Sequence, residues 1–242
     1  MTDWITPSWP APANVRALVT TRAGGVSVGP NASKNLGAHV GDDPAAVAEN
    51  RAILGRATAC APLWLTQVHG TAVAVCGEVG QGSEADAAVS RLPGLACAMM
   101  TADCLPVLLC NRAGTVVGAA HAGWRGLCDG VIEAAVAAMG VPGAEILAWL
   151  GPAIGPAAFE VGGEVRQAFV SRDPAAEVAF TVRENGKWLA DLYLLARLRL
   201  RVVGVTSISG GDLCTVAEPG RFFSYRRDGV TGRMASLVWL AT

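Results

Sequence analysis

The sequence predicts a mixed α/β (α+β) fold with a layered sheet core. Short apolar runs without polar alternation recur along the chain, and such runs are typical of strands buried on both faces. Between them lie segments with apolar residues at helical spacing. No internal repeat, low-complexity tract or long Pro/Gly/Ser linker interrupts the 242 residues, so we expect a single domain, residues 1–242.

Short apolar runs along the whole chain are the candidate strands. Each is four to seven residues long, which is a normal length for a strand. The expected strands are residues 17–21, 63–68, 72–75, 96–101, 107–110, 116–120, 146–150, 202–208 and 236–240.

Four segments are candidate helices. Asp42 and Asp43 stand before the first of them and are suitable N-cap residues. In the second segment, Leu127, Val131 and Ala135 fall on one face. The expected helices are residues 44–55, 126–139, 163–169 and 189–200.

Charge in this chain is sparse and balanced. Hydrophobic residues make up 52% and charged residues 16%, and 19 Lys and Arg against 20 Asp and Glu give a net charge of -1. This composition argues against disorder and fits a tightly layered domain or a homodimer. Affinity for nucleic acid depends on clustered Lys and Arg, so we expect no nucleic-acid partner.

The mean hydropathy of +0.38 raises the question of a membrane span, which needs roughly 18 consecutive apolar residues. No such run exists, because Asp103 interrupts residues 95–110 and two glutamates interrupt residues 131–154. The opening MTDWITPSWPAPANV lacks the basic and apolar regions of a secretory signal. We therefore expect a cytoplasmic protein with no membrane partner and with its seven cysteines reduced.

Histidine is scarce in the chain, which contains His39, His69 and His121 only. His69 follows the apolar run 63–68 and precedes a glycine, and His121 follows the run 116–120 and precedes AGWRG. Strand ends that lead into glycine-rich turns are where α/β proteins place functional groups. We therefore expect His69 and His121 to be functional, and His39 to shape the pocket.

Cys104 is the candidate thiol partner of these histidines. It lies between Asp103 and a proline at an interruption between two apolar runs, whereas Cys97 and Cys110 are flanked by apolar residues and are expected to be core. Two chemistries use one thiol and two imidazoles. Two histidines and a cysteine can hold a catalytic zinc with one open position, or a metal-free Cys–His pair can act as nucleophile and base. Composition and spacing do not separate the two.

Arg22 stands in the glycine turn TRAGGVS, where its planar guanidinium suits a phosphate or carboxylate. A surface arginine without function is the alternative. The C-terminal segment FFSYRRD is interpreted as a solvated turn against a core edge.

Taken in order, several motifs resemble the laccase-domain family, also called YfiH-type or polyphenol oxidase-type proteins. The match runs from about residue 16 to residue 240, and HAGWRG together with ADCLP is highly specific. The motifs are TRAGGVS, NLGAHVGDD, WLTQVHG, MTADCLPVLL, HAGWRG, GPAIGP, FEVG, CT, FFSYRRD and TGR.

The resemblance implies an α/β/β/α layered domain similar to the catalytic domain of cytotoxic necrotizing factor. It also implies a zinc-dependent purine nucleoside enzyme that phosphorolyses adenosine, inosine and 5′-methylthioadenosine and deaminates adenosine, with nucleoside and phosphate as partners. Bacterial members are also linked to peptidoglycan editing. Position by position, the zinc ligands and catalytic residues fall on His69, Cys104 and His121, and the substrate-binding positions on Arg22, Asn35 and Arg125.

True multicopper laccase chemistry is excluded by counting. A multicopper oxidase needs a blue-copper site plus a trinuclear cluster with many more histidines than the three in this chain. Copper is expected only as a substitute for zinc at the one His2Cys site. Two other classes stay open: a metal-independent Cys–His hydrolase or amidase acting on peptidoglycan precursors, and a non-catalytic zinc-binding protein.

Overall fold

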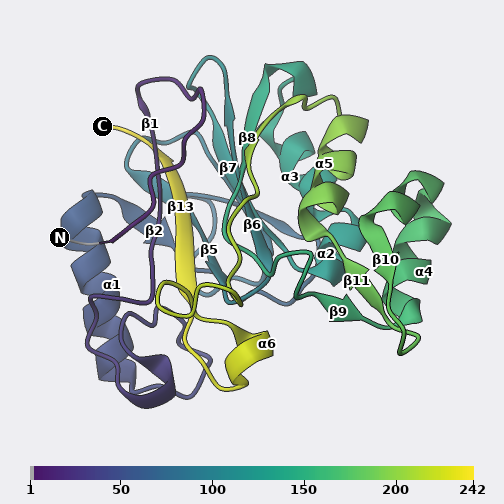
Figure 1. The fold of residues 1–242 in the computed structure, drawn as a ribbon. Helices are drawn as coiled ribbons and strands as arrows, with labels where there is room; N and C mark the ends of the chain where they lie inside the picture. The colour runs from purple at the N-terminus through teal and green to yellow at the C-terminus, as the bar shows by residue number, and fades with distance from the viewer. Residues whose placement is uncertain (1–2) are drawn as a thin grey trace.

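The computed structural model describes residues 3–242, and its elements stack in four layers (Figure 1). A four-stranded sheet packs face to face with a six-stranded sheet. One helix covers the outer face of the first sheet, and a group of helices covers the outer face of the second. The order is therefore α/β/β/α, in agreement with the expected mixed α/β fold and its layered core.

The four-stranded sheet lies next to the N-terminal helix. Its strands, in spatial order, are β1 (Val15–Val19), β13 (Met234–Leu240), β5 (Leu95–Thr101) and β2 (Ala61–Leu63). β13 pairs antiparallel with β1 and β5, and β2 runs parallel to β5. Helix α1 (Pro44–Thr58) covers this sheet through Leu54, and the Asp43 carboxylate caps it by accepting a hydrogen bond from the Ala45 N–H, as the sequence predicts.

The six-stranded sheet is the centre of the molecule. Its strands, in spatial order, are β12 (Ser207–Gly210), β8 (Ile146–Leu150), β6 (Leu105–Asn111), β7 (Val117–Ala122), β4 (Ala87–Ser90) and β3 (Val73–Val75). The inner pairs β8/β6, β6/β7 and β7/β4 are antiparallel, and the two edge pairs are parallel. Of the metal-site candidates, Cys104 directly precedes β6 and His121 lies in β7, so the β6/β7 hairpin carries both.

Strand β6 shows why the apolar runs lack alternation. Leu108 faces the other sheet and packs in one cluster with Met99 and Trp149, whereas Val107 and Leu109 face the helices. Every residue of this strand is buried, because both faces of the sheet are covered. An unbroken apolar run is the sequence consequence of such double burial.

Helices cover the far face of the six-stranded sheet, and a small sheet lies beside them (Figure 1). That small sheet pairs its strands in the order β10-β11-β9. These elements are α2 (Trp124–Asp129), α3 (Val131–Met139), α4 (Gly163–Arg172), α5 (Leu192–Val202), β9 (Glu160–Val161), β10 (Phe180–Val182) and β11 (Trp188–Ala190), and the short α6 (Tyr225–Asp228) follows later.

Several element boundaries differ from the sequence prediction. The helix expected over 126–139 is two helices, because Gly130 adopts φ +108°, a left-handed conformation that ends α2. The strand expected over 63–68 ends at Leu63, and the strand expected over 202–208 begins only at Ser207, because α5 extends to Val202. Strands β4, β9, β10 and β11 were not predicted, since they are two to four residues long.

Among residues 3–242, no helix is long and apolar enough to cross a bilayer.

Candidate metal centre

Three segments bring His69, Cys104 and His121 together. His69 comes from the loop that follows β2, Cys104 from the turn between β5 and β6, and His121 from the penultimate position of β7. One nitrogen of each imidazole and the Cys104 sulfur all lie within 4.8 Å of one another. The Cys104 Sγ is 3.7 Å from His69 Nε2, and the two imidazole rings meet edge to face. His121 thus lies inside a strand, and His69 lies in a loop rather than at a strand end.

The turn before β6 places Cys104. Asp103 adopts φ +98°, which is unusual for a residue other than glycine and reverses the chain between β5 and β6. The Asp103 carboxylate holds this conformation by accepting hydrogen bonds from the Thr215 hydroxyl (2.5 Å) and the Arg226 N–H (2.6 Å). Asp103 therefore fixes Cys104 and the start of α6 against each other, which accounts for an acidic residue between two apolar runs.

Asp86 ties the His69 loop to His121. Its carboxylate is fully buried and accepts hydrogen bonds from the backbone N–H groups of Val68 (3.1 Å), His69 (2.9 Å) and Gly70 (2.7 Å). It also accepts the Nδ1–H of His121 at 2.8 Å. One side chain therefore folds the loop and orients an imidazole, and Asp86 was not singled out from the sequence.

The electrostatics of the site are those of an ion pair. Burial raises the pKa of the Cys104 thiol, but the imidazoles of His121 and His69 outweigh burial and lower that pKa to about 6. Burial lowers the pKa of His121, but Cys104 and Asp86 outweigh it and raise that pKa to about 9. Both shifts favour a thiolate beside an imidazolium in the metal-free site, and a metal ion would displace the Nε2 proton of His121.

These residues fit a metal ion. Because Asp86 takes the Nδ1–H of His121, the Nε2 of His121 is left as the ligand atom, and a carboxylate behind a histidine is the usual support of a zinc ligand. A thiolate with two imidazoles is a donor set that selects zinc or copper. Three protein ligands leave one coordination position open, which is the pattern of catalytic zinc.

Gly123 lies close to two of the three candidate ligands, so a substitution there can test the metal site. A Cβ atom on Gly123 would lie 2.7 Å from Cδ2 of His69 and 3.0 Å from the Cys104 sulfur, although its φ of -61° suits alanine. We expect Gly123→Ala to push these two ligands apart and to lower zinc affinity by about tenfold or more, in the range of other changes around metal ligands. Zinc titration with a competing chelator measures the change.

The matched control for this variant is Gly163→Ala. Gly163 is the first residue of helix α4, and a Cβ atom there would meet nothing within 4 Å. Unchanged zinc affinity in Gly123→Ala, with both variants folded, would contradict the ligand assignment.

A cavity of about 410 Å³ opens over the three candidate ligands. Its volume lies within the roughly 300–1,000 Å³ of small-molecule sites. A second cavity of about 470 Å³ shares His39, Gln67 and Met100 with it and extends to Trp64. His39 therefore lines the pocket, as the sequence suggests. The residues that line the cavity over the ligands are His39, Gln67, His69, Met100, Thr101, Ala102, Cys104, His121, Tyr225 and Arg233.

The three expected substrate-binding residues lie outside the described lining of this cavity. The guanidinium of Arg22 donates hydrogen bonds to the carbonyls of Ala32 and Pro219, so it stabilises loops. Arg125 is exposed, with its guanidinium over the Trp124 ring. These contacts use the donors of the Arg22 guanidinium within the fold.

Asn35 does not line the cavity but holds a segment of its wall in place. It is fully buried, and its amide oxygen accepts the backbone N–H of Arg233 at 2.8 Å and that of Gly37 at 2.9 Å. Its amide nitrogen donates to the Asp42 carboxylate at 2.8 Å. Asn35 therefore positions the segment that carries Arg233, a cavity-lining cation that the sequence reasoning did not select. The motif TGR, which contains Arg233, was the available signal.

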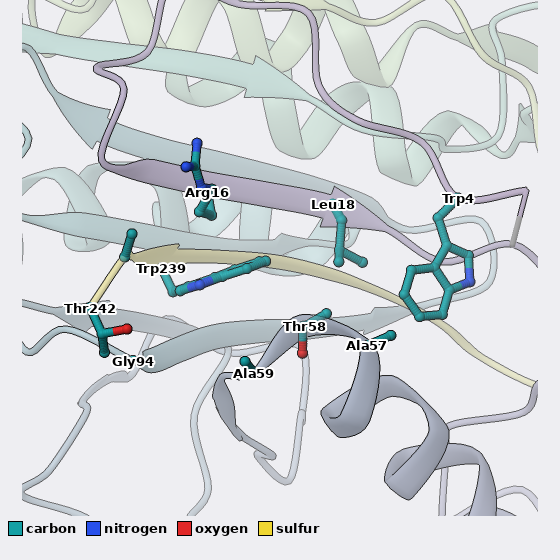
Figure 2. A pocket seen from close by; sticks show the side chains of 10 residues that line it. Trp4, Arg16, Leu18, Ala57, Thr58, Ala59, Gly94, Trp239 and Thr242 are labelled. Atoms are coloured by element: carbon teal, nitrogen blue, oxygen red, sulfur yellow. The ribbon is translucent and has the colours of Figure 1, made fainter.

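A cavity of about 440 Å³ lies on the α1 face of the four-stranded sheet, at the C-terminal end of α1. Figure 2 shows Trp4, Leu18 and Trp239 around it, beside the end of α1 at Ala57 and Thr58. Its described lining contains neither histidine nor cysteine, so the chemistry of the chain is concentrated at the other cavity.

Comparison with known proteins identifies the family of the chain. Residues 16–241 match the sequence profile of a family described as multi-copper polyphenol oxidoreductase laccase. The chain belongs to this family. The resemblance of its motifs to the laccase-domain family is thereby confirmed. The family description names multi-copper chemistry, but this chain has only three histidines.

Curated relatives cover the whole length of this laccase-domain chain. A Pseudomonas aeruginosa protein named purine nucleoside phosphorylase is 59% identical over 241 residues, which are 99% of each chain. An Escherichia coli protein named purine nucleoside phosphorylase YfiH is 57% identical over 243 residues, with 99% of this chain and 100% of the relative covered.

Solved structures of laccase-domain relatives share the fold. A crystal structure of a Neisseria meningitidis protein superposes with a TM-score of 0.97 at 55% identity and covers 99% of this chain and 100% of the other. YlmD from Geobacillus stearothermophilus superposes with a TM-score of 0.89 at 31% identity and covers 96% and 94%.

Proposed function

We propose that this laccase-domain protein is a zinc-dependent purine nucleoside phosphorylase. On this proposal it phosphorolyses adenosine, inosine and 5′-methylthioadenosine, and it also deaminates adenosine hydrolytically. The names of its full-length relatives support the first activity. The observation that carries the proposal is the His69, Cys104 and His121 cluster at the floor of a cavity large enough for a nucleoside.

His69, Cys104 and His121 would hold the zinc ion. Zinc, when bound, supplies Lewis acidity at the floor of the cavity. The chain does the rest: Asp86 keeps the Nδ1 proton on His121 and so fixes its tautomer, and its backbone hydrogen bonds hold His69 in place. Copper can replace zinc on the same donors, since it binds them more strongly.

Phosphorolysis requires a nucleophile and a leaving base. An oxygen of phosphate attacks C1′ of the ribose, the bond from C1′ to N9 breaks, and the purine departs with a proton. The developing positive charge on the ribose favours an anionic nucleophile held close to it. The protein must therefore bind a nucleoside and an oxyanion side by side, and the cavity over the ligands adjoins further cavities that offer that room.

The decisive experiment is a product assay with defined metal and phosphate. The purified protein with one equivalent of zinc is incubated with inosine or adenosine, with and without inorganic phosphate. We expect free hypoxanthine or adenine together with ribose 1-phosphate, only when phosphate is present. Release of neither a free base nor inosine from adenosine would overturn the proposal.

The geometry also favours a second candidate. The Cys104 sulfur lies 3.7 Å from His69 Nε2, and its lowered pKa makes it a thiolate at pH 7, as a cysteine nucleophile requires. A metal-independent hydrolase or amidase acting on peptidoglycan precursors would use this pair directly. Its activity would survive a chelator, which the zinc-dependent reaction does not. A non-catalytic zinc protein would instead keep zinc without any nucleoside shifting its melting temperature.

Four broader expectations belong with this proposal. We propose that residues 1–242 form one domain and that the protein works in the cytoplasm, where nucleosides and phosphate are available. The similarity to the catalytic domain of cytotoxic necrotizing factor and the homodimer are likewise predictions.

A further inference from the structure

We propose that a small cavity beside the metal cavity is the binding site for inorganic phosphate, with Arg233 and Thr231 as its principal ligands. This inference rests on the proposed phosphorolysis. It assigns the oxyanion to one place and two side chains, neither of which was selected from the sequence.

The small cavity has the size and position of an oxyanion subsite. Its volume is about 230 Å³, below the roughly 300–1,000 Å³ of pockets that take whole drug-sized molecules. It shares His39, Tyr225 and Arg233 with the cavity over the metal ligands. A phosphate bound there would therefore lie across a common wall from the nucleoside.

Arg233 supplies a cation without a carboxylate partner. Among residues 3–242, no Asp or Glu forms an ion pair with it. Its Nη1 donates to the carbonyls of Thr231 (2.9 Å) and Gly232 (3.1 Å), while its backbone N–H is held by Asn35. The guanidinium is thus fixed in place, and its remaining donors suit a planar, two-point contact with phosphate.

Thr231 adds a buried hydroxyl group without a hydrogen-bond partner. It lines the small cavity and is only 2% exposed, yet its hydroxyl has no hydrogen-bond partner among the described residues. A buried hydroxyl without a partner costs stability, so such a group usually awaits a ligand or a water. An oxyanion accepts hydrogen bonds and would satisfy this hydroxyl.

The surroundings favour an anion over a cation. Within the described chain, no Asp or Glu lines the small cavity or either of the two larger cavities connected to it. Their walls carry the cations Arg51 and Arg233 and the imidazole of His39. An acidic wall would repel phosphate, whereas the guanidinium of Arg233 attracts it.

The test uses two pairs of variants. Thr231→Val removes the hydroxyl and keeps the shape, and Thr231→Ser keeps the hydroxyl. Arg233→Lys keeps the charge and removes the planar fork. Arg183→Gln, on the exposed β10/β11 turn, is the control for a lost positive charge elsewhere. Thermal melting of every variant verifies that it is folded.

Binding of inorganic phosphate to the zinc-loaded protein is measured by calorimetry, and the KM for phosphate and for inosine by steady-state kinetics. We expect Thr231→Val and Arg233→Lys to raise the Kd and the KM for phosphate by about tenfold or more, as for a lost hydrogen bond to a charged group. In Thr231→Val the KM for inosine stays within about twofold, because Thr231 does not line the cavity over the metal ligands. Thr231→Ser loses less phosphate affinity than Thr231→Val, because it keeps the hydroxyl, and Arg183→Gln behaves as the wild type.

The calorimetry separates this inference from the proposed function. Weaker phosphate binding in the two variants supports the subsite even if no free base is ever released, in which case only the proposed function fails. Phosphate that binds the wild type and both variants equally overturns the subsite while leaving phosphorolysis intact. A wild-type protein that does not bind phosphate also overturns it.

Discussion

Replacing Cys104 by serine is expected to abolish zinc binding and to lower phosphorolysis by at least about 100-fold. The thiolate is the one soft, negatively charged donor in the cluster, and a hydroxyl does not replace it at neutral pH. A bound metal contributes several kcal/mol to a transition state, and about 1.4 kcal/mol corresponds to a tenfold rate change. Metal content by mass spectrometry and kcat/KM for inosine check this result.

The control for Cys104→Ser is Cys60→Ser. The Cys60 thiol donates to the Thr58 hydroxyl at 3.2 Å, a bond that serine can also make, and it is not part of the ligand cluster. Chelation of the wild type completes the experiment. Loss of activity on chelation and its return with added zinc support the zinc-dependent enzyme, whereas a chelator-resistant activity that Cys104→Ser removes would establish the cysteine nucleophile instead.

Asp86→Ala should have the largest effect on stability. We expect the free energy of unfolding to fall by about 3–5 kcal/mol, as on removal of one partner from a buried pair. Three backbone N–H groups and the His121 Nδ1–H lose their acceptor inside the protein. Zinc affinity should also fall by about 10–100-fold, because the histidine loses its supporting carboxylate. Denaturant unfolding of the metal-free protein and zinc titration measure the two effects separately.

Asp86→Asn is the conservative partner of this variant. The amide keeps one oxygen acceptor but replaces the other by an NH2 group, which faces N–H groups in this site. We expect a smaller loss of stability than in Asp86→Ala together with a similar loss of zinc affinity. If both variants bind zinc as tightly as the wild type, Asp86 serves the fold alone.

The sequence predicts the layers better than it predicts their ends. The apolar run 107–110 identifies β6 because the strand is buried on both faces, and Asp43 marks the start of α1 by its capping chemistry. The helix predicted over 126–139 is too long, because Gly130 ends α2 in a left-handed conformation. The sequence does not reveal which conformation a glycine within a helical pattern adopts. The run 63–68 is apolar for another reason: Leu63 and Leu65 face the core from a strand end and a loop.

The candidate site was accessible from the sequence only where rare residues marked it. His69, Cys104 and His121 stand out because histidine is scarce and because Asp103 and Pro106 interrupt apolar runs. Asp86 carries no such signal, since its role depends on a loop whose course is not encoded locally.

Arg233 is one of 19 Lys and Arg residues in the chain. Its place in the cavity wall follows from a contact with Asn35, almost 200 positions earlier in the chain. Such a contact between distant segments cannot be read from the neighbours of either residue.

The three candidate ligands come from three separate segments, joined by Asp86 and by the β6/β7 hairpin. None of these three segments alone offers more than one donor, so an unfolded chain would not hold a metal ion at this site. On the proposed function, metal would be acquired only once the three segments have folded together. A bound ion would then stabilise the folded protein by mass action, and metal starvation would shorten its lifetime as well as lower its activity.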